Sequence, residues 1–186
     1  MTAPVAGVDA VMIHFRTLLL SHLQTAINTI LAEQGDTFTL TAPDAEHTVL
    51  SRSWAPPQKV NGIQIFAKSE VETGAYHNIG APVLDTSEVE IQVWPLSEDT
   101  SLLDTKRARW AQAIKRVIVE QWRTLGNPAA IVSAVCKIAY TSLREQAGVV
   151  GVYRRFALPF GASQDIVDPI SVLVVVRHFV ACTVEW

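Results

Sequence analysis

The chain has 186 residues, of which 49% are apolar and 18% charged, with a net charge of −3 and a pI of about 5.9. The length favours a single domain over residues 1–186, and a charged share below the usual ~25% predicts that some apolar surface is buried against partners. The acidic balance argues against sequence-specific nucleic-acid binding. The longest apolar stretch, residues 170–176, is far shorter than the ~20 residues of a membrane-spanning helix, and the N-terminal segment lacks the basic residues of a signal peptide.

The first predicted element is a long helix over residues 8–33, in which apolar side chains recur at three- and four-residue steps. The negative charge of Asp9 is favourable at the positive N-terminal end of the helix dipole, and Gly35 can adopt the left-handed backbone conformation that ends a helix. The less regular residues 36–61 contain two β-rich stretches, 37–41 and 48–54, which predict short strands separated by a turn.

A strand is expected over residues 62–68, followed by an exposed polar loop over residues 69–87. Residues 88–94 alternate strictly, because Val89, Ile91 and Val93 point one way and the polar residues between them point the other. This pattern predicts a half-buried strand of an antiparallel sheet.

A second amphipathic helix is expected over residues 102–125, with Ser101 and Asp104 as a capping box and Gly126 as its stop. A third helix is expected over residues 128–146, because Pro128 suits a first turn and the apolar residues keep a helical period. The β-rich composition of residues 133–140 leaves a strand as the alternative interpretation of this stretch.

Two strands are expected to close the chain, over residues 149–160 and 170–186, joined by an exposed hairpin loop over residues 161–169. The second is apolar on both faces, which predicts a central place in the sheet. The order of elements predicts an α+β fold: an antiparallel β-sheet of about four to six strands with helices packed mainly on one face. The side chains expected in the core include Leu103, Ile114, Val117, Val135, Val150, Phe156, Val174 and Val176.

Motifs that carry chemistry do not emerge from the sequence. The five histidines are scattered along the sequence instead of being clustered as metal ligands are. The two cysteines, Cys136 and Cys182, have apolar neighbours, which raise the pKa of a thiol and make it less reactive. The sequence contains no phosphate-binding loop or nucleophile elbow motif. We therefore expect no catalytic residues, no metal, no cofactor and no small-molecule substrate.

Charge is divided unevenly along the chain. Residues 36–100 hold ten acidic and three basic residues, for −7, whereas residues 101–186 hold six acidic and eleven basic residues, for +5. This division is typical of a nucleic-acid surface or, equally, of a protein whose acidic surface meets the basic surface of a neighbouring copy. Arg109, Arg116 and Arg123 repeat every seven residues along one helix, so they predict an exposed row, which is either a solvated helix face or a surface that meets carboxylates or phosphates. The candidate interface residues are these three, together with Arg154, Arg155, Glu70, Glu72, Glu88 and Glu90.

One stretch resembles a known family. Residues 88–122, EVEIQVWPLSEDTSLLDTKRARWAQAIKRVIVEQW, form an alternating strand, a short polar turn and a long amphipathic helix. The leading helix precedes this stretch, and the segments GVYRRFALPF and ISVLVVVRHFVACTVEW follow it. This order resembles the tail terminator and tail-completion proteins of the neck of long-tailed bacteriophages. Residues 36–61 and the third helix stand as additions to that pattern.

The resemblance implies a structural virion protein with no catalytic residues. It would form a ring, expected to be hexameric, that caps the tail tube, binds the tail tube protein and the head–tail connector protein, and is assembled in the host cytoplasm. Two alternatives remain open. One is a different neck, connector or head-closure protein, and the other is a small α+β enzyme whose active residues meet only in the fold.

Overall fold

The computed structural model describes residues 7–50, 61–72, 83–94, 102–124, 130–139 and 170–180. The expected strand at 149–160 and the expected loop at 161–169 lie outside these residues. Two helices and five strands follow one another in the described part: α1 (Val8–Gln34), β1 (Thr48–Val49), β2 (Gly62–Glu72), β3 (Val83–Trp94), α2 (Leu103–Gln121), β4 (Ile131–Ala139) and β5 (Ile170–Val180).

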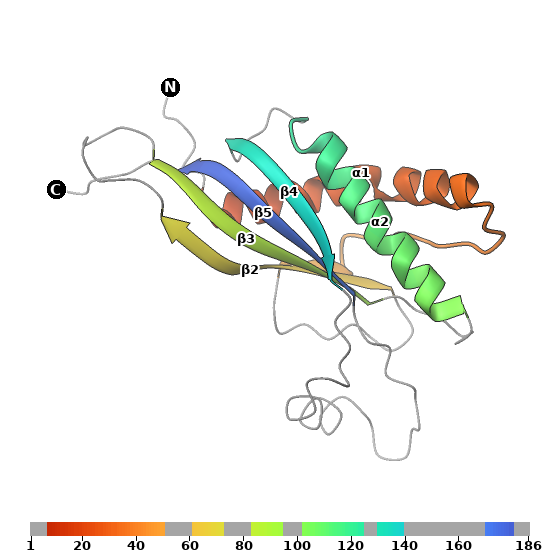
Figure 1. Ribbon diagram of the computed structural model, residues 1–186. Helices are drawn as coiled ribbons and strands as arrows, with labels where there is room; N and C mark the ends of the chain where they lie inside the picture. Colours follow the sequence, from red (N-terminus) through yellow and green to blue (C-terminus); the bar gives the residue numbers. More distant parts are fainter. Residues whose placement is uncertain are drawn as a thin grey trace, which may run out of the picture.

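The five strands form one sheet in the order β1-β2-β3-β5-β4 (Figure 1). The predicted α+β class is confirmed, and the number of strands falls within the expected range. The sheet is mixed rather than antiparallel throughout, because the short β1 runs parallel to β2 while every other neighbouring pair is antiparallel. β5 lies between β3 and β4, as its apolar sequence predicted.

α1 spans almost the range that the sequence predicted. Gly35 ends it with a left-handed backbone at φ 69°, where the amide nitrogens of Gly35 and Asp36 donate to the last-turn carbonyls of Ala32 and Leu31. The apolar stripe of the helix is buried, and Val11, Phe15, Leu18 and Ile27 have no exposed surface.

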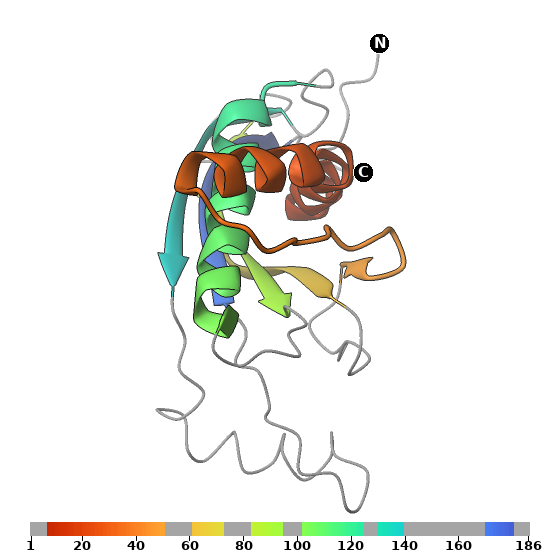
Figure 2. The same ribbon diagram turned by 90° about the vertical axis from the view of Figure 1, so that its right-hand side faces the viewer.

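The segment after α1 runs back along the helix toward β1 (Figure 2). The side-chain oxygen of Gln24 accepts a hydrogen bond from the backbone amide of Ala42 at 2.8 Å, and its side-chain nitrogen donates one to the carbonyl oxygen of Leu40 at 3.1 Å. The predicted strand over residues 37–41 is wrong, because these backbone groups bond to a helix side chain instead of to another strand. Of the predicted strand over residues 48–54, Thr48–Val49 is β1, and the remainder from residue 51 lies outside the described residues.

β2 and β3 are longer than their sequences suggested. The predicted loop over residues 69–87 is wrong at both of its ends, where the strands stay paired as far as Glu72 opposite Asp85. Polar residues occur here without ending the strands, because β3 is paired with β5 on its other side along its whole length except Trp94. A shift of register between Ala67 and Ser69 marks a bulge in β2.

α2 begins close to its predicted start and ends four residues before its predicted end, residue 125. Leu102 is its N-cap residue and makes no side-chain capping bond, while Ser101 of the expected capping box lies outside the described residues. Trp110, Ile114 and Ile118 are fully buried, as the predicted apolar stripe required.

The third helix predicted over residues 128–146 is wrong, because residues 131–139 form strand β4. Ala134, Cys136 and Ile138 pack against the core, and the residues between them face outward, which is the two-residue period of a strand. The apolar spacing here fitted both periods. Pairing with β5, more than thirty residues away in sequence, decides in favour of the strand.

The core is a single cluster that contains residues of both helices and of alternate positions on the sheet, including Val89 and Ile91 of β3 and Val172 of β5. α1 lies against α2 and β2, and α2 lies against β4 and β5. That the helices cover mainly one face of the sheet stays a prediction. The core prediction holds for Ile114, Val117, Val174 and Val176 and is wrong for Val135, whereas the side chains of Leu103, Val150 and Phe156 lie outside the described residues.

Candidate functional site

The arginines predicted to form an exposed row on α2 are engaged within the subunit. The Nε atom of Arg109 lies 2.6 Å from Oδ2 of Asp36, and both side chains are mostly buried, with 18% and 14% of their surface exposed. This ion pair joins α2 to the residue that follows the C-cap of α1. Arg109 therefore holds the two helices together, and its predicted role at a subunit interface stays untested.

Arg116 makes two further ion pairs. Its Nη2 lies 2.9 Å from Oε2 of Glu33, and its Nε lies 3.5 Å from Oε1 of Glu120 one helical turn later. The hydrogen bond to Glu33 raises the pKa of Arg116, so the side chain is always charged. Arg123, the third member of the row, is exposed and places its guanidinium 4.5 Å from the ring centre of Trp122. Arg154 and Arg155 lie outside the described residues.

The predicted acidic residues also have partners on the sheet. Glu88 lies 3.3 Å from the ammonium group of Lys68 on the neighbouring strand. Glu90 accepts hydrogen bonds from the hydroxyl of Ser171 at 2.7 Å and from the amide of Gln92 at 3.0 Å. The side chains of Glu70 and Glu72 are outside the described set, although their backbones belong to β2.

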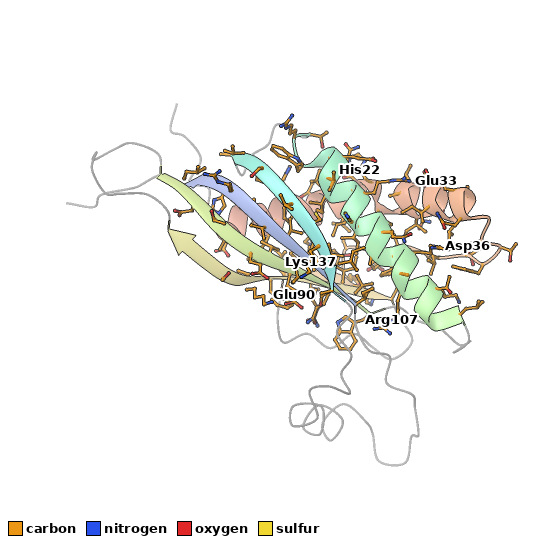
Figure 3. All side chains as sticks on the ribbon, in the orientation of Figure 1. His22, Glu33, Asp36, Glu90, Arg107 and Lys137 are labelled. Atoms are coloured by element: carbon orange, nitrogen blue, oxygen red, sulfur yellow. The ribbon has the colours of Figure 1, made fainter. Side chains whose placement is uncertain are left out.

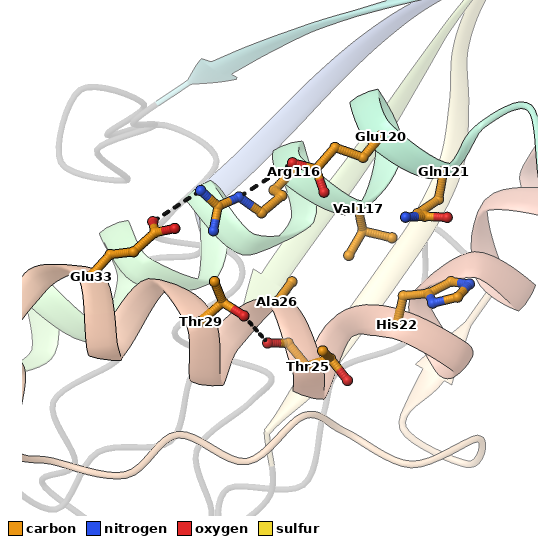
Figure 4. Close-up of a pocket in the computed structure, with 9 residues that line it drawn as sticks. All are labelled: His22, Thr25, Ala26, Thr29, Glu33, Arg116, Val117, Glu120 and Gln121. Atoms are coloured by element: carbon orange, nitrogen blue, oxygen red, sulfur yellow. Dashed lines mark hydrogen bonds and ion pairs between the residues drawn. The ribbon is translucent and has the colours of Figure 1, made fainter.

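A groove of about 320 Å³ lies between α1 and α2 (Figure 4). Its polar groups are largely paired with one another, since Glu33 and Glu120 both bond to Arg116, and the hydroxyl of Thr29 donates to the carbonyl oxygen of Thr25 at 2.9 Å. His22 and Gln121 complete the polar part of the lining. The groove is at the small end of ligand sites and lacks a nucleophile paired with a base, so its geometry does not support catalysis.

A buried polar cluster lies elsewhere, where β3 and β5 pair. The hydroxyl of Ser87 is 2.8 Å from Nε2 of His178, and neither residue has exposed surface. Asp85 lies directly across from His178 in the strand register and is 6% exposed. Oδ1 of Asp85 and Nδ1 of His178 have no hydrogen-bond partner among the described residues.

The residue types of this cluster are those of a serine hydrolase, but burial keeps the hydroxyl of Ser87 from any substrate. The sequence did not reveal the cluster, because residues 69–87, which include Asp85 and Ser87, have the polar composition of a loop. The signal that could have found it is the alternation of residues 85, 87 and 89, which continues the buried side of the strand upstream.

The thiol of Cys136 is likewise not a nucleophile. The residue is partly buried on β4, and burial raises its pKa to about 11, with the charge of Lys115 acting in the opposite direction. A thiol with this pKa is protonated near neutral pH. Among the described residues, no group of three or more histidine, cysteine or carboxylate side chains could hold a metal ion.

Val135, the most exposed large apolar side chain among the described residues, belongs to an apolar patch on β4 and β5. Val135 and Val175 face each other across the two strands and are 66% and 43% exposed. Lys137 and Arg177 lie two residues further along each strand on the same face, on opposite sides of the valine pair because the strands are antiparallel. Both are exposed, and neither has an ion-pair partner within the described part of the chain. We call Val135, Val175, Lys137 and Arg177 the β4–β5 patch.

The β4–β5 patch lies away from Glu33 and Asp36, the acidic residues that pair with the arginines of α2. Lys137 is near Glu90 on the sheet, whereas Glu33 and Asp36 are at the far end of α1 (Figure 3). Glu90 is the nearest described acidic residue without a cationic partner, and it stands across Leu173 from Lys137. Next to the valines, Glu88 is already neutralised by Lys68.

Comparison of the chain with models of known protein families and with curated proteins found no match. Neither of the two described helices is long and apolar enough to cross a membrane. A function for this chain therefore has to be inferred from its surfaces and from the order of its elements.

Proposed function

We propose that this chain is a structural assembly protein of a long-tailed bacteriophage, a tail terminator-like subunit that forms a ring, caps the tail tube and joins the tail to the head connector. The observation that carries the assembly role is the β4–β5 patch. Two valines that face each other in water lose the stabilisation that burial of apolar surface provides, about 25 cal/mol per Å². A partner that covers them would recover it.

The position of the patch supports the same role. Among the described strands, β4 is the last of the sheet and β5 is its neighbour. An edge strand with exposed apolar side chains is a surface suited to association. The cationic side chains beside the valines would orient an acidic partner more than they would add to affinity.

The order of elements supports the choice of family. The described part of the chain runs through a long helix, three strands, a second helix and two more strands. The helix expected over residues 128–146 stood as an addition to the terminator pattern. Residues 131–139 form a strand instead, which still precedes the two segments that end the resemblance. Residues 36–61 still stand as an addition. A different neck, connector or head-closure protein remains the nearest alternative, because it would need the same kind of surface.

Light scattering coupled to size-exclusion chromatography tests the assembly role, followed by electron microscopy of the oligomer. We expect a species several times heavier than the 20.4 kDa subunit and ring-shaped particles. A monomer at every concentration would overturn the proposal. A tagged chain found at the head-proximal end of assembled tails would favour the terminator, and one found in the connector would favour the alternative.

The remaining alternative, a small α+β enzyme, would have to use the buried cluster of Ser87, His178 and Asp85, whose residue types are those of a hydrolase. Reaction with a fluorophosphonate probe tests it, because such probes label serine residues that an adjacent histidine activates. We expect no labelling of the native chain, since Ser87 is fully buried. Labelling that disappears in the Ser87→Ala variant would establish the hydrolase.

A further inference from the structure

A second exposed apolar surface lies on α1. Ile13 and Leu20 are 54% and 39% exposed, although they belong to the helix that supplies much of the core. Residues 9, 13, 16 and 20 are spaced so that they share one face of a helix. Phe15 and Leu18, which are fully buried, point toward the core from the other side of the same turns.

Acidic side chains surround this surface. Asp9 lies one turn before Ile13, and the guanidinium of Arg16 holds the returning segment against the helix through the carbonyl oxygens of Ala45 and Thr48, at 2.8 and 2.6 Å. These bonds place Asp44 and Glu46, both exposed, beside the same helix face. We call Asp9, Ile13, Leu20, Asp44 and Glu46 the α1 patch.

The charge of the α1 patch is negative even when Arg16 is counted, because three carboxylates face one guanidinium. The hydrogen bond from His47, at 2.6 Å, lowers the pKa of Asp44, so this carboxylate stays ionised at mildly acidic pH. The β4–β5 patch carries the opposite sign, since Lys137 and Arg177 outnumber Glu90, the nearby carboxylate that has hydrogen bonds but no cationic partner among the described residues. Each patch therefore has an apolar centre, and their surrounding charges are complementary.

The two patches also point in different directions. On the sheet, Val135 and Val175 point away from the core, because the residues on either side of them in sequence face it. On α1, Ile13 and Leu20 point away from the same core, because they lie on the face of the helix opposite the buried residues. A subunit with two unlike, complementary surfaces can associate head to tail, and such contacts build rings when the rotation closes.

We propose that the β4–β5 patch of one subunit docks on the α1 patch of the next copy of this chain. This inference rests on the proposed ring, and it names the two surfaces that form each joint. Val135 and Val175 pack against Ile13 and Leu20, while Lys137 and Arg177 face the carboxylates of the neighbouring α1 patch. The arginines of α2 then serve the fold of each subunit, and the sheet supplies the basic side of the joint.

Disulfide trapping between two different single-cysteine subunits tests this arrangement. In a background that carries Cys136→Ala and Cys182→Ala, one preparation carries Ile13→Cys and the other carries Val135→Cys. After dissociation, mixing and reassembly, mild oxidation is expected to give a cross-linked dimer from the mixture and none from either preparation alone. A chain with both substitutions is expected to give a covalent ladder that ends at the ring size.

Val119 provides the matched control, because it is a valine 47% exposed on α2 that belongs to neither patch. In mixtures with Ile13→Cys, Val119→Cys is expected to give no cross-link. In a second experiment, Val135→Glu and Ile13→Glu each raise the concentration needed for half-assembly by about tenfold or more, because each places a charge in a desolvated joint. Val119→Glu leaves that concentration unchanged.

The outcomes separate this inference from the proposed function. Cross-links within the Ile13→Cys preparation or within the Val135→Cys preparation would show like-to-like contacts and overturn the head-to-tail joint. Rings that form normally in Val135→Glu and Ile13→Glu would overturn the choice of patches while leaving the ring intact. A native chain that is monomeric at every concentration would remove the ring itself.

Discussion

The guanidinium of Arg109 lies 2.6 Å from the carboxylate of Asp36, across 73 residues of sequence, and this ion pair joins α2 to the end of α1. Asp36 directly follows Gly35, whose left-handed backbone ends α1, so the same turn directs the Asp36 carboxylate toward α2. A residue expected on a surface between subunits thus stabilises the subunit itself. Charge reversal at Arg109 would disturb folding before it could report on assembly.

Asp36→Ala is expected to lower the free energy of unfolding by about 1.5–3 kcal/mol, because it leaves a mostly buried guanidinium without its charged partner. Urea unfolding followed by circular dichroism measures the change. Glu33→Ala, which removes the more exposed partner of Arg116, is the control and should have the smaller effect. Equal losses in the two variants would contradict the structural role assigned to Arg109.

Ile114→Ala is expected to cost about 2–5 kcal/mol of stability, because Ile114 is fully buried in the core between the helices and the sheet. Val119→Ala, on the same helix but 47% exposed, is expected to change stability by less than about 0.5 kcal/mol. Thermal and urea unfolding of both variants measure the difference. Similar losses would mean that α2 presents a different face to the sheet.

Gly35→Ala is expected to cost about 1–2 kcal/mol, because a Cβ atom is strained at φ 69° even though nothing lies within 4 Å of it. Gly35→Asn should cost less, since asparagine tolerates the left-handed region better than alanine. Denaturant unfolding measures both changes. A loss in Gly35→Asn as large as that in Gly35→Ala would point to something other than backbone conformation.

The opposite change is expected at Ala130, which has φ 50° immediately before β4. Ala130→Gly relieves this strain and should raise stability by about 0.5–1 kcal/mol after the greater flexibility of glycine in the unfolded chain is taken into account. The melting temperature measures the gain. A variant less stable than the native chain would show that the methyl group of Ala130 contributes packing that outweighs the strain.

Stability is expected to fall as pH rises above 9, because burial raises the pKa of the Cys136 thiol to about 11 from an ordinary value near 9.0. A raised pKa means that the folded chain binds the proton more tightly, so this contribution is complete below pH 9 and is lost between about pH 9 and 11. Comparing Cys182→Ala with Cys136→Ala/Cys182→Ala over that range isolates the effect. Parallel profiles for the two proteins would contradict it.

Alkylation by iodoacetamide gives an independent check on the same thiol. In the Cys182→Ala variant at pH 8.5, Cys136 should react many times more slowly in the folded chain than in urea, because the thiolate is the reacting species. Equal rates would show that the thiol is ionised as readily in the fold as in the unfolded chain.

Local patterns in the sequence determined both helices and the strict alternation of β3. The stripe of α1 and the buried series Trp110, Ile114 and Ile118 of α2 repeat with the helical period, and Gly35 marks the end of α1 in the way the sequence predicts. Such signals depend on residues that are neighbours in sequence, so no tertiary information was needed to interpret them.

Tertiary structure decided what residues 131–139 became, how far β2 and β3 extend, and which charges are free. The apolar spacing of β4 fits a helix and a strand equally, and its pairing with β5 selects the strand and turns Val135 outward. Arg109 and Arg116 have the spacing of an exposed row, but the end of α1 brings Asp36 and Glu33 to them. Ser87 and His178 meet because β3 and β5 are neighbours. In each case the deciding partner is distant in sequence, and only the packed chain brings it within contact.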